Sequence, residues 1–195
     1  MKIAILRYNA GNTQSVIYAL NRLGIEPVVT DNIEELKSSD KIIFPGVGEA
    51  STAMQYLQDK GLDKIIPTFK QPLLGICLGL QLMCQYSEEN DTECLGIFPI
   101  MVKRFPPQGK VPQMGWNSIA HLKGALFQNI RENDFVYFVH SYYAELHPTY
   151  TIAETNYILP YSSAIQKDNF YAVQFHTEKS SETGSEILKN FIELT

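Results

Sequence analysis

Hydrophobic positions in the first half of the chain alternate between two patterns, short apolar runs and longer segments with apolar residues at helical spacing. The apolar runs have the length of buried strands and cover residues 2–6, 26–30, 41–44 and 72–76. Helices are predicted between them at residues 13–23 and 51–60, and Asp31 with Glu34 resembles the capping box of a short helix. This alternation predicts βαβ units, and hence a three-layer α/β sandwich with a mainly parallel central sheet and helices on both faces.

The pattern changes after Cys94, where strand-like runs follow one another through turns that contain Pro and Gly. These runs cover residues 100–105, 113–119, 135–140, 151–155, 163–166 and 171–175. A last helix is predicted at residues 182–194, where four apolar side chains form one stripe: Ile187, Leu188, Phe191 and Ile192. The second half is therefore expected to add antiparallel strands to the sheet, and we predict one domain over residues 1–195.

Composition and charge exclude several classes of function. The 195 residues are 45% hydrophobic and 19% charged, which is typical of a globular protein. A net charge of −5 without a run of Lys or Arg argues against a nucleic-acid or anionic-membrane partner, and no apolar stretch has the length of a membrane span. Three cysteines, an odd number, predict reduced thiols and a cytoplasmic protein. Their spacing matches no metal motif, so we expect no metal and no other cofactor.

The most informative stretch joins a predicted strand to a predicted helix around Cys77. Residues 75–79 read Gly-Ile-Cys-Leu-Gly, the cysteine counterpart of the G-x-S-x-G nucleophile elbow. Glycines are needed because a Cβ on either side would collide with the neighbouring strand or the first helical turn. The turn is expected to aim the sulfur at the helix N-terminus, where backbone N–H groups favour a thiolate. The alternative is a small apolar cysteine that fills a buried junction.

A cysteine nucleophile needs a base, and His176 is the strongest candidate among the four histidines. His176 ends a predicted strand and Glu178 follows it by two residues, so in extended chain both side chains point to the same side. The alternative is an ordinary pair at a solvated strand end. His121 and His147 are expected at the surface, whereas His140 ends another predicted strand.

Acyl transfer also needs hydrogen-bond donors for the developing oxyanion. The N–H of Leu78, the first residue after the cysteine, is one candidate. Residues 45–48, Pro-Gly-Val-Gly, are another, because two glycines permit backbone angles that turn an N–H inward. Both segments follow predicted strands, and the carboxyl ends of the strands are where doubly wound folds bind their ligands.

Three motifs in this order resemble class I, triad-type glutamine amidotransferases: residues 45–48, residues 75–81 and Gln-Phe-His-Thr-Glu at 174–178. Within that family, residues 114–117, 138–142 and 175–180 are similar to the glutaminase subunits of imidazole glycerol phosphate synthases. The resemblance covers essentially the whole chain. It implies a flavodoxin-like fold and hydrolysis of L-glutamine to glutamate and ammonia through a γ-glutamyl thioester on Cys77.

The resemblance also implies a role for each residue that matches the motifs. His176 is expected to act as base and acid, Glu178 to orient it, and Val47, Gly48 and Leu78 to surround the oxyanion. The amino acid would be held by Gly46, Gln81, Glu89, Ser141 and Tyr142. Gln81 has independent support because it lies four residues after Cys77 on the same helical face, whereas Glu89 could equally be a solvated acid at a helix end.

A partner is implied as well: the chain would form a heterodimer with a (βα)8-barrel cyclase that uses the ammonia in histidine biosynthesis. Sheltered transfer has a chemical reason, since free ammonia in neutral water is almost entirely ammonium, which is no nucleophile. The partner-facing positions are Asn12, Met114, Trp116, Tyr137 and Lys179. For Trp116 and Tyr137, both in strand-like runs, a place in the core is the alternative.

Three residues depart from the family pattern. Thr177 stands where proline usually separates the histidine from the glutamate, and threonine allows a wider φ range. Arg7 and Asn9 stand where the first loop usually has Asp and Gly, and this loop faces the partner in the family.

Three other functions stay open on the sequence alone. The same glutaminase could serve another synthase, of pyridoxal phosphate or of a surface sugar. The chain could instead be a free-standing cysteine hydrolase of γ-glutamyl or peptide substrates. Lastly, it could be a catalytically silent flavodoxin-like binding module in which Cys77 is only packed.

Overall fold

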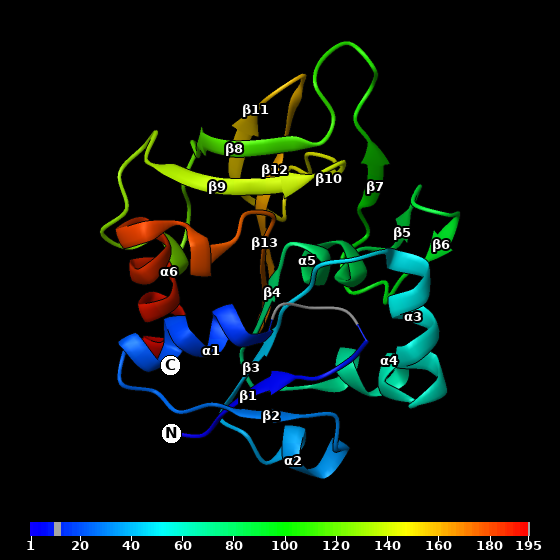
Figure 1. Cartoon of the computed structure of the whole chain (residues 1–195), viewed down its shortest axis with the longest axis vertical. Coiled ribbons are helices and arrows are strands. Elements are labelled where there is room, and N and C mark those ends of the chain that lie inside the picture. The colour runs from blue at the N-terminus through cyan, green and yellow to red at the C-terminus, as the bar shows by residue number, and fades with distance from the viewer. Residues whose placement is uncertain (10–12, 195) are drawn as a thin grey trace.

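A mixed sheet runs through the centre of the structure, and its first strands are parallel (Figure 1). The computed structural model describes residues 1–9 and 13–194. β1 (Ile3–Leu6) pairs in parallel with β2 (Val28–Thr30) and β3 (Lys41–Phe44), and β4 (Leu73–Ile76) pairs in parallel with β3. These strands are apolar on both sides because helices cover both faces of the sheet.

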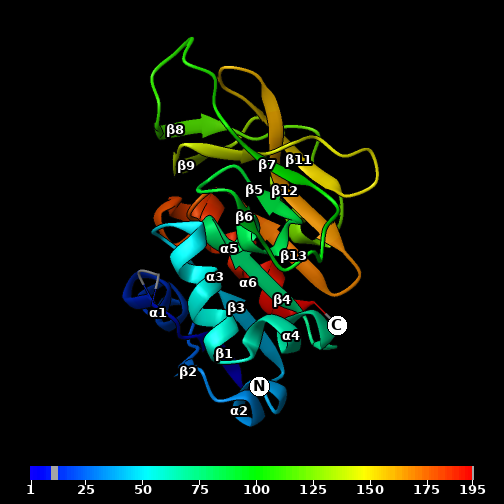
Figure 2. The ribbon, with the colours of Figure 1, turned by 90° about the vertical axis from the view of Figure 1, so that its right-hand side faces the viewer.

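The helices form two layers, as Figures 1 and 2 show from two directions. α1 (Thr13–Arg22) and α6 (Ser181–Glu193) lie on one face, while α2 (Ile33–Lys37), α3 (Ala50–Asp59), α4 (Leu62–Ile65) and α5 (Leu78–Met83) pack on the other. Each face of the sheet has its own hydrophobic core, and alternate strand residues point into the two cores. Ile3 and Ile5 face α1 and α6, whereas Ala4 and Leu6 face the other helical layer. The predicted three-layer sandwich is therefore confirmed. None of the helices within residues 1–9 and 13–194 combines the length and the apolar character that a membrane span requires.

The second half of the chain extends the sheet with antiparallel strands, as predicted. β13 (Phe170–Val173) pairs in parallel with β4, and β12 (Pro160–Lys167) then pairs antiparallel with β13 and with β11 (Thr151–Asn156). β10 (Tyr142–Ala144) joins β12 to β7 (Met101–Arg104), and the short β5 (Tyr86–Ser87) and β6 (Thr92–Glu93) complete the edge. Single 3-10 turns occur at η1 (Ile66–Thr68), η2 (Ala125–Phe127) and η3 (Thr177–Lys179).

Two predicted strands form a small sheet of their own. β8 (Gln113–Ser118) pairs antiparallel with β9 (Phe135–His140), and the pair lies across one end of the main sheet (Figure 1). Val136, Phe138 and His140 are buried against the body of the molecule. The opposite face of β9 and the outward residues of β8 are available to solvent.

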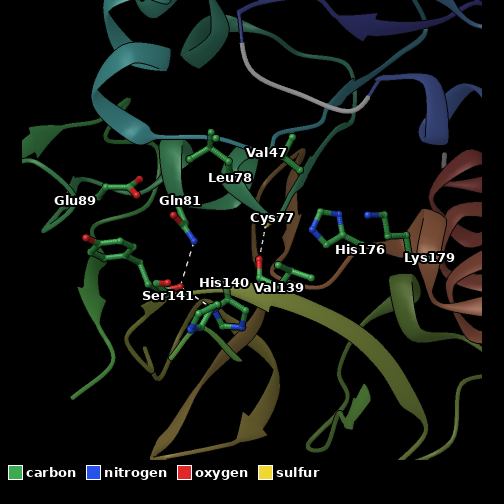
Figure 3. Close-up of a pocket in the computed structure, with 13 residues that line it drawn as sticks. Val47, Cys77, Leu78, Gln81, Glu89, Val139, His140, Ser141, His176 and Lys179 are labelled. Atoms are coloured by element: carbon green, nitrogen blue, oxygen red, sulfur yellow. Dashed lines mark hydrogen bonds between the residues drawn. The ribbon is translucent and has the colours of Figure 1, made fainter. Parts of the chain in front are cut away.

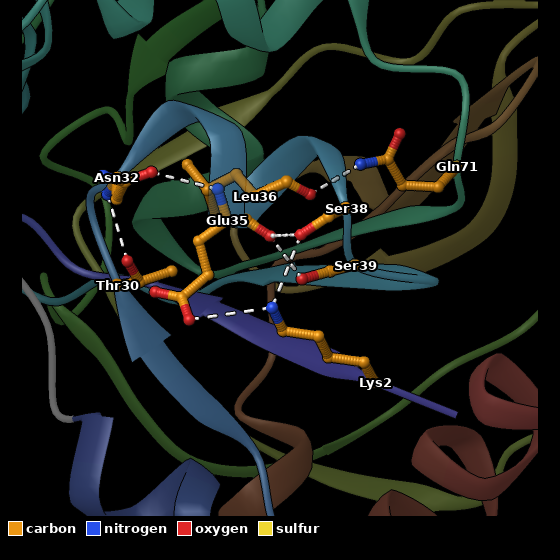
Figure 4. A network of polar contacts seen from close by, with 8 residues as sticks. All are labelled: Lys2, Thr30, Asn32, Glu35, Leu36, Ser38, Ser39 and Gln71. Atoms are coloured by element: carbon orange, nitrogen blue, oxygen red, sulfur yellow. Dashed lines mark hydrogen bonds and ion pairs between the residues drawn. The ribbon is translucent and has the colours of Figure 1, made fainter.

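The cap predicted for α2 is wrong by one residue. Asn32, not Asp31, caps the helix, because its Oδ1 accepts the N–H of Glu35 at 3.0 Å (Figure 4). Asp31 points elsewhere because it has cationic partners: the Arg7 guanidinium lies 2.5 Å from it and the Lys60 ammonium 3.6 Å. The Arg7 contact holds the pKa of the Asp31 carboxyl below its usual range.

Candidate active site

A pocket of about 310 Å³ opens at the carboxyl end of β4 (Figure 3). It collects most of the side chains predicted for the site, although they come from elements far apart in the sequence. The predicted residues that line it are Val47, Gly48, Cys77, Leu78, Gln81, Glu89, Ser141, Tyr142, His176 and Lys179. The strand ends therefore do meet where the fold rule places ligands.

Cys77 occupies the sharp turn between β4 and α5. Its φ of 53° and ψ of −106° lie in a region that residues with a Cβ rarely adopt, which is the strained geometry of a nucleophile elbow. The turn is held from below by the N–H of Cys77, which donates to the carbonyl of Val173 at 2.8 Å. A Cβ on Gly79 would lie 2.0 Å from the carbonyl oxygen of Phe44 on β3, so only glycine lets α5 approach the sheet this closely.

His176 and Glu178 meet as a buried pair. Nδ1 of His176 lies 2.8 Å from Oε1 of Glu178, and each side chain is only 3% exposed. The contact does not arise from extended chain, as the sequence suggested, because β13 ends at Val173 and His176 is the N-cap of η3. His176 itself has an extended backbone (φ −85°, ψ 100°), but Thr177 and Glu178 already belong to η3.

Two hydrogen bonds join the turn that carries His176 to β9, and a third closes the turn itself. The N–H of His176 donates to the carbonyl of Tyr137 at 2.9 Å. The hydroxyl of Ser180 accepts the N–H of Tyr137 at 2.9 Å and donates to the carbonyl of His176 at 2.6 Å. This arrangement fixes the backbone of His176 relative to the small sheet; Ser180 ends the matched stretch 175–180 but was given no role from the sequence.

The charge state of His176 depends on its two neighbours. Burial by itself lowers the pKa of this imidazole, but its interactions with the Cys77 side chain and with Glu178 outweigh burial and raise the pKa to about 10. Cys77 and His176 line the same pocket, and the interaction between their side chains favours a protonated imidazole near the sulfur. This is the arrangement that an activated cysteine requires.

One predicted oxyanion donor is already engaged. The N–H of Leu78 donates to the carbonyl of Gly46 at 3.3 Å, so it does not point into an empty oxyanion site in this structure. Residues 45–48 are held from the other side by Tyr8, whose hydroxyl donates to the carbonyl of Pro45 at 2.6 Å. Gly48 has a φ of 125°, which agrees with the unusual backbone angles expected of this loop.

Gln81 and Glu89 enter the pocket from different elements. The Nε2 of Gln81, on α5, donates to the carbonyl of Tyr142 at 3.2 Å. Glu89 does not lie at a helix end, because α5 stops at Met83 and the polar residues that follow form the β5–β6 turn. Its Oε2 accepts the N–H of Ala50, the first residue of α3, at 2.7 Å, and burial raises the pKa of its carboxyl. Glu89 thus combines a structural contact with a place at the pocket wall.

Comparisons with known proteins agree with this geometry. A model of the family "Glutamine amidotransferase class-I" matches residues 5–194. The chain belongs to this family. It is 58% identical over 197 residues to an imidazole glycerol phosphate synthase subunit HisH of Bacteroides fragilis, and 55% identical to the subunit of the same name in Bacteroides thetaiotaomicron. Both matches cover 100% of this chain and of the relative.

The same fold occurs in a solved structure of a glutamine amidotransferase. That structure superposes with a TM-score of 0.77, covers 99% of this chain and 98% of its own, and is 18% identical in sequence. At this identity the likeness shows the fold alone. It confirms the predicted fold class for this member of the amidotransferase family.

A second histidine of the amidotransferase site was not assigned a role from the sequence. His140, at the end of β9, lines the pocket but is 5% exposed, with Nδ1 2.8 Å from the carbonyl of Tyr142 and Nε2 3.2 Å from the hydroxyl of Tyr161. Burial is the main reason that the pKa of His140 falls to about 4, so its ring is neutral near pH 7. The signals in the sequence were its position at a strand end and its place in the matched stretch 138–142.

The predicted partner-facing residues gather on the outer face of β8 and β9. Met114 and Trp116 are 59% and 52% exposed, so the alternative of a core position is wrong for Trp116. Tyr137 is half-buried, and its ring meets that of Trp116 edge to face at 5.9 Å. Phe135, exposed on the same face, extends the surface and was not predicted. Lys179 lines the pocket, and Asn12 lies outside the described residues.

The departures from the family pattern have local explanations. Thr177 is the first residue of η3, a position where proline also fits because the N–H there needs no helical partner, so either residue suits this turn. Arg7 forms an ion pair with Asp31 of the same chain. The side-chain amide of Asn9 donates to the carbonyl of Thr52 on α3 at 3.1 Å.

Proposed function

We propose that this chain is the glutaminase subunit of an imidazole glycerol phosphate synthase. It would hydrolyse L-glutamine to glutamate and ammonia and pass the ammonia to a (βα)8-barrel cyclase in a heterodimer. The observation that carries the proposal is an elbow cysteine that shares one pocket with a buried His–Glu pair, in a chain that resembles HisH subunits over its full length. This similarity favours that synthase over the pyridoxal phosphate and surface-sugar alternatives.

The reaction would proceed in two halves. His176 takes the thiol proton of Cys77, and the sulfur attacks the side-chain carbonyl carbon of glutamine to form a C–S bond and an oxyanion. Collapse of this intermediate breaks the C–N bond, and ammonia leaves with the proton from His176. In the second half His176 deprotonates water, which attacks the thioester and releases glutamate and the thiol. Glu178 keeps the imidazole oriented throughout, because its carboxylate accepts from Nδ1.

The pocket has groups suited to the amino acid end of glutamine. Glu89 contributes a carboxylate to the wall, which can meet the α-ammonium group of the substrate. Gln81, Ser141 and Tyr142 also line the pocket and offer neutral hydrogen-bonding groups. Figure 3 labels Gln81 and Ser141. Gly46 packs against Leu78, where a Cβ would lie 2.6 Å from Leu78 Cβ, so its role is to bring the loop close to the elbow.

The engaged N–H of Leu78 supports activation by the partner. While that N–H donates to the carbonyl of Gly46, it cannot stabilise an oxyanion, so residues 45–48 must rearrange before the chemistry can proceed. One such donor contributes roughly 3–4 kcal/mol to the barrier, which corresponds to a rate change of about 10²–10³-fold. A cyclase that docks on the exposed face of Met114, Trp116 and Tyr137 would sit beside the pocket.

A cytoplasmic location belongs to the same proposal. Cys77, Cys84 and Cys94 are all free thiols, as expected in a reducing compartment.

The test is glutaminase turnover of the purified chain, measured as glutamate release, with and without a cyclase subunit and its nucleotide ligand. Negligible turnover alone and strong activation by the liganded cyclase are expected, and Cys77→Ala should be inactive in both cases. Rapid turnover by the isolated chain, with no response to any cyclase, would support a free-standing hydrolase instead.

A further inference from the structure

The sulfur of Cys77 has a polar neighbour that the proposed mechanism does not use. Gln174 lies two residues before His176 and is fully buried. Its side-chain amide lies 3.7 Å from the sulfur, a normal hydrogen-bonding distance for this larger atom. The backbone N–H of Gln174 donates to the carbonyl of Ser163 at 2.8 Å, so the residue is fixed in the sheet region behind the pocket.

The orientation of this amide follows from a neighbouring carbonyl. Side-chain amides can be flipped without a change of shape, so their hydrogen-bond partners must decide which atom points where. The carbonyl of Tyr142 can only accept, and it lies 3.2 Å from the amide of Gln81, which must therefore present Nε2 (Figure 3). The same Nε2 lies 3.2 Å from the amide of Gln174, which must present Oε1 to it. The amide nitrogen of Gln174 is then the atom that faces the sulfur.

Two other groups near the sulfur do not donate a hydrogen bond to it. The carbonyl of Val139 lies 3.8 Å away and can accept from a thiol but not stabilise a thiolate. The predicted donor, the start of α5, does not fill the role either: the Cys77 side chain makes no capping hydrogen bond there, and the N–H of Leu78 is taken by Gly46.

The titratable groups near the sulfur come from several elements. Those in contact or electrostatic interaction with it are His176, Tyr8 and Tyr161, with Glu178 behind His176, and His140, Glu89 and Lys179 also line the pocket. Burial raises the pKa of both Tyr8 and Tyr161 well above the usual value, so both stay neutral. Of the described residues in this set, His176 is the cation next to the sulfur, and it gives its proton away during each half-reaction.

We propose that Gln174 is a catalytic residue of this site: its amide donates a hydrogen bond to the Cys77 thiolate, and Gln81 holds the amide in the donating orientation. The proposal rests on the proposed function for its place in the reaction. The bond stabilises negative charge on the sulfur when the thiol proton moves to His176, and again when the thioester is cleaved. Gln81, at the pocket wall, links the substrate side of the pocket to the nucleophile.

Alkylation of Cys77 by iodoacetamide, followed by mass spectrometry from pH 5 to pH 10, tests this on the isolated chain. Gln174→Met keeps an unbranched side chain of similar size but has no donor, while Gln81 keeps its bond to Tyr142. We expect the midpoint of the alkylation profile to rise by about one pH unit, so that about tenfold less thiolate is present below it. Gln81→Met should raise the midpoint by less, because it only loosens the amide of Gln174.

Gln113→Met is the matched control, since Gln113 is also a buried glutamine (2% exposed) but contacts Tyr161 rather than the sulfur. Its alkylation midpoint should equal that of the wild type. If Gln174→Met fails to fold by circular dichroism, Gln81→Met decides alone. Unchanged midpoints in the folded variants would overturn the proposal. Failure of the proposed function would appear differently, as a reactive Cys77 in a wild-type chain that no cyclase activates.

Discussion

Replacement of Cys77 by alanine should lower the pKa of His176. The pKa of about 10 lies roughly 3.5 above the ordinary 6.5, which corresponds to about 5 kcal/mol in favour of the imidazolium. Burial opposes this, so the Cys77 side chain and Glu178 together supply more than the net effect, and the sulfur's hydrogen bond is the larger favourable contribution. We therefore expect the pKa of His176 to fall by about two units or more in Cys77→Ala.

NMR of histidine ring nitrogens across pH 5–11 measures this pKa directly. His121, exposed at the surface, should give the same signals in both proteins and serves as the control. The free energy of unfolding should depend on pH in the same way. A raised pKa of His176 in the folded state stabilises the fold fully below pH 6.5, and this stabilisation is lost as the pH rises toward 10. In Cys77→Ala the loss should be complete at lower pH. An identical pKa of His176 in both proteins would refute the coupling of the sulfur to the imidazole.

Three further predictions concern stability and rate. Glu178→Gln should lower kcat of the activated enzyme roughly 10- to 100-fold with little change in KM, because a charge-assisted hydrogen bond to the His176 imidazole is lost. Steady-state kinetics measure both constants, and a change in KM alone would contradict this prediction. Gly79→Ala should cost at least about 3 kcal/mol of unfolding free energy in urea titrations, since its Cβ would meet the Phe44 carbonyl at 2.0 Å. Gly24→Ala, with open space around it but a φ of 77°, should cost only about 1 kcal/mol, and equal losses would contradict the steric explanation. Because the pKa of His140 is lowered to about 4, its neutral form stabilises the fold above pH 6.5, and about 3 kcal/mol should be lost as the pH falls from 6.5 to 4. His140→Gln should reduce that loss, and the same acid dependence in both proteins would exclude His140 as its source.

Most of the fold was predictable because local hydrophobic patterns determine its strands and helices. Buried parallel strands need apolar residues on both sides, and the runs at residues 3–6, 41–44 and 73–76 could hardly adopt another structure. The stripe on α6 was equally clear, and all four of its apolar side chains are buried. The separate β8–β9 sheet was not predictable in this way, because strand pairing depends on contacts between distant residues.

The residues of the site also differ in how far local sequence patterns predict them. Cys77 and its flanking glycines were visible because the elbow demands small residues at fixed spacing. The contact of His176 with Glu178 was expected for the wrong reason, since the backbone turns into η3 where an extended strand was assumed. Gln174 and Ser180 belong to the matched motifs but received no role, because the function of a buried amide or hydroxyl depends on neighbours brought close by folding. The roles of the catalytic, oxyanion, substrate-binding and partner-facing residues, and the single domain, stay predictions.

The most direct test of the central claim is labelling of Cys77 by a glutamine-like electrophile, read by mass spectrometry with and without a cyclase subunit and its nucleotide ligand. We expect one covalent adduct on Cys77, formed faster when the liganded cyclase is present, and none at residue 77 of Cys77→Ala. A wild-type Cys77 that stays unmodified even in the complex would contradict its assignment as the nucleophile.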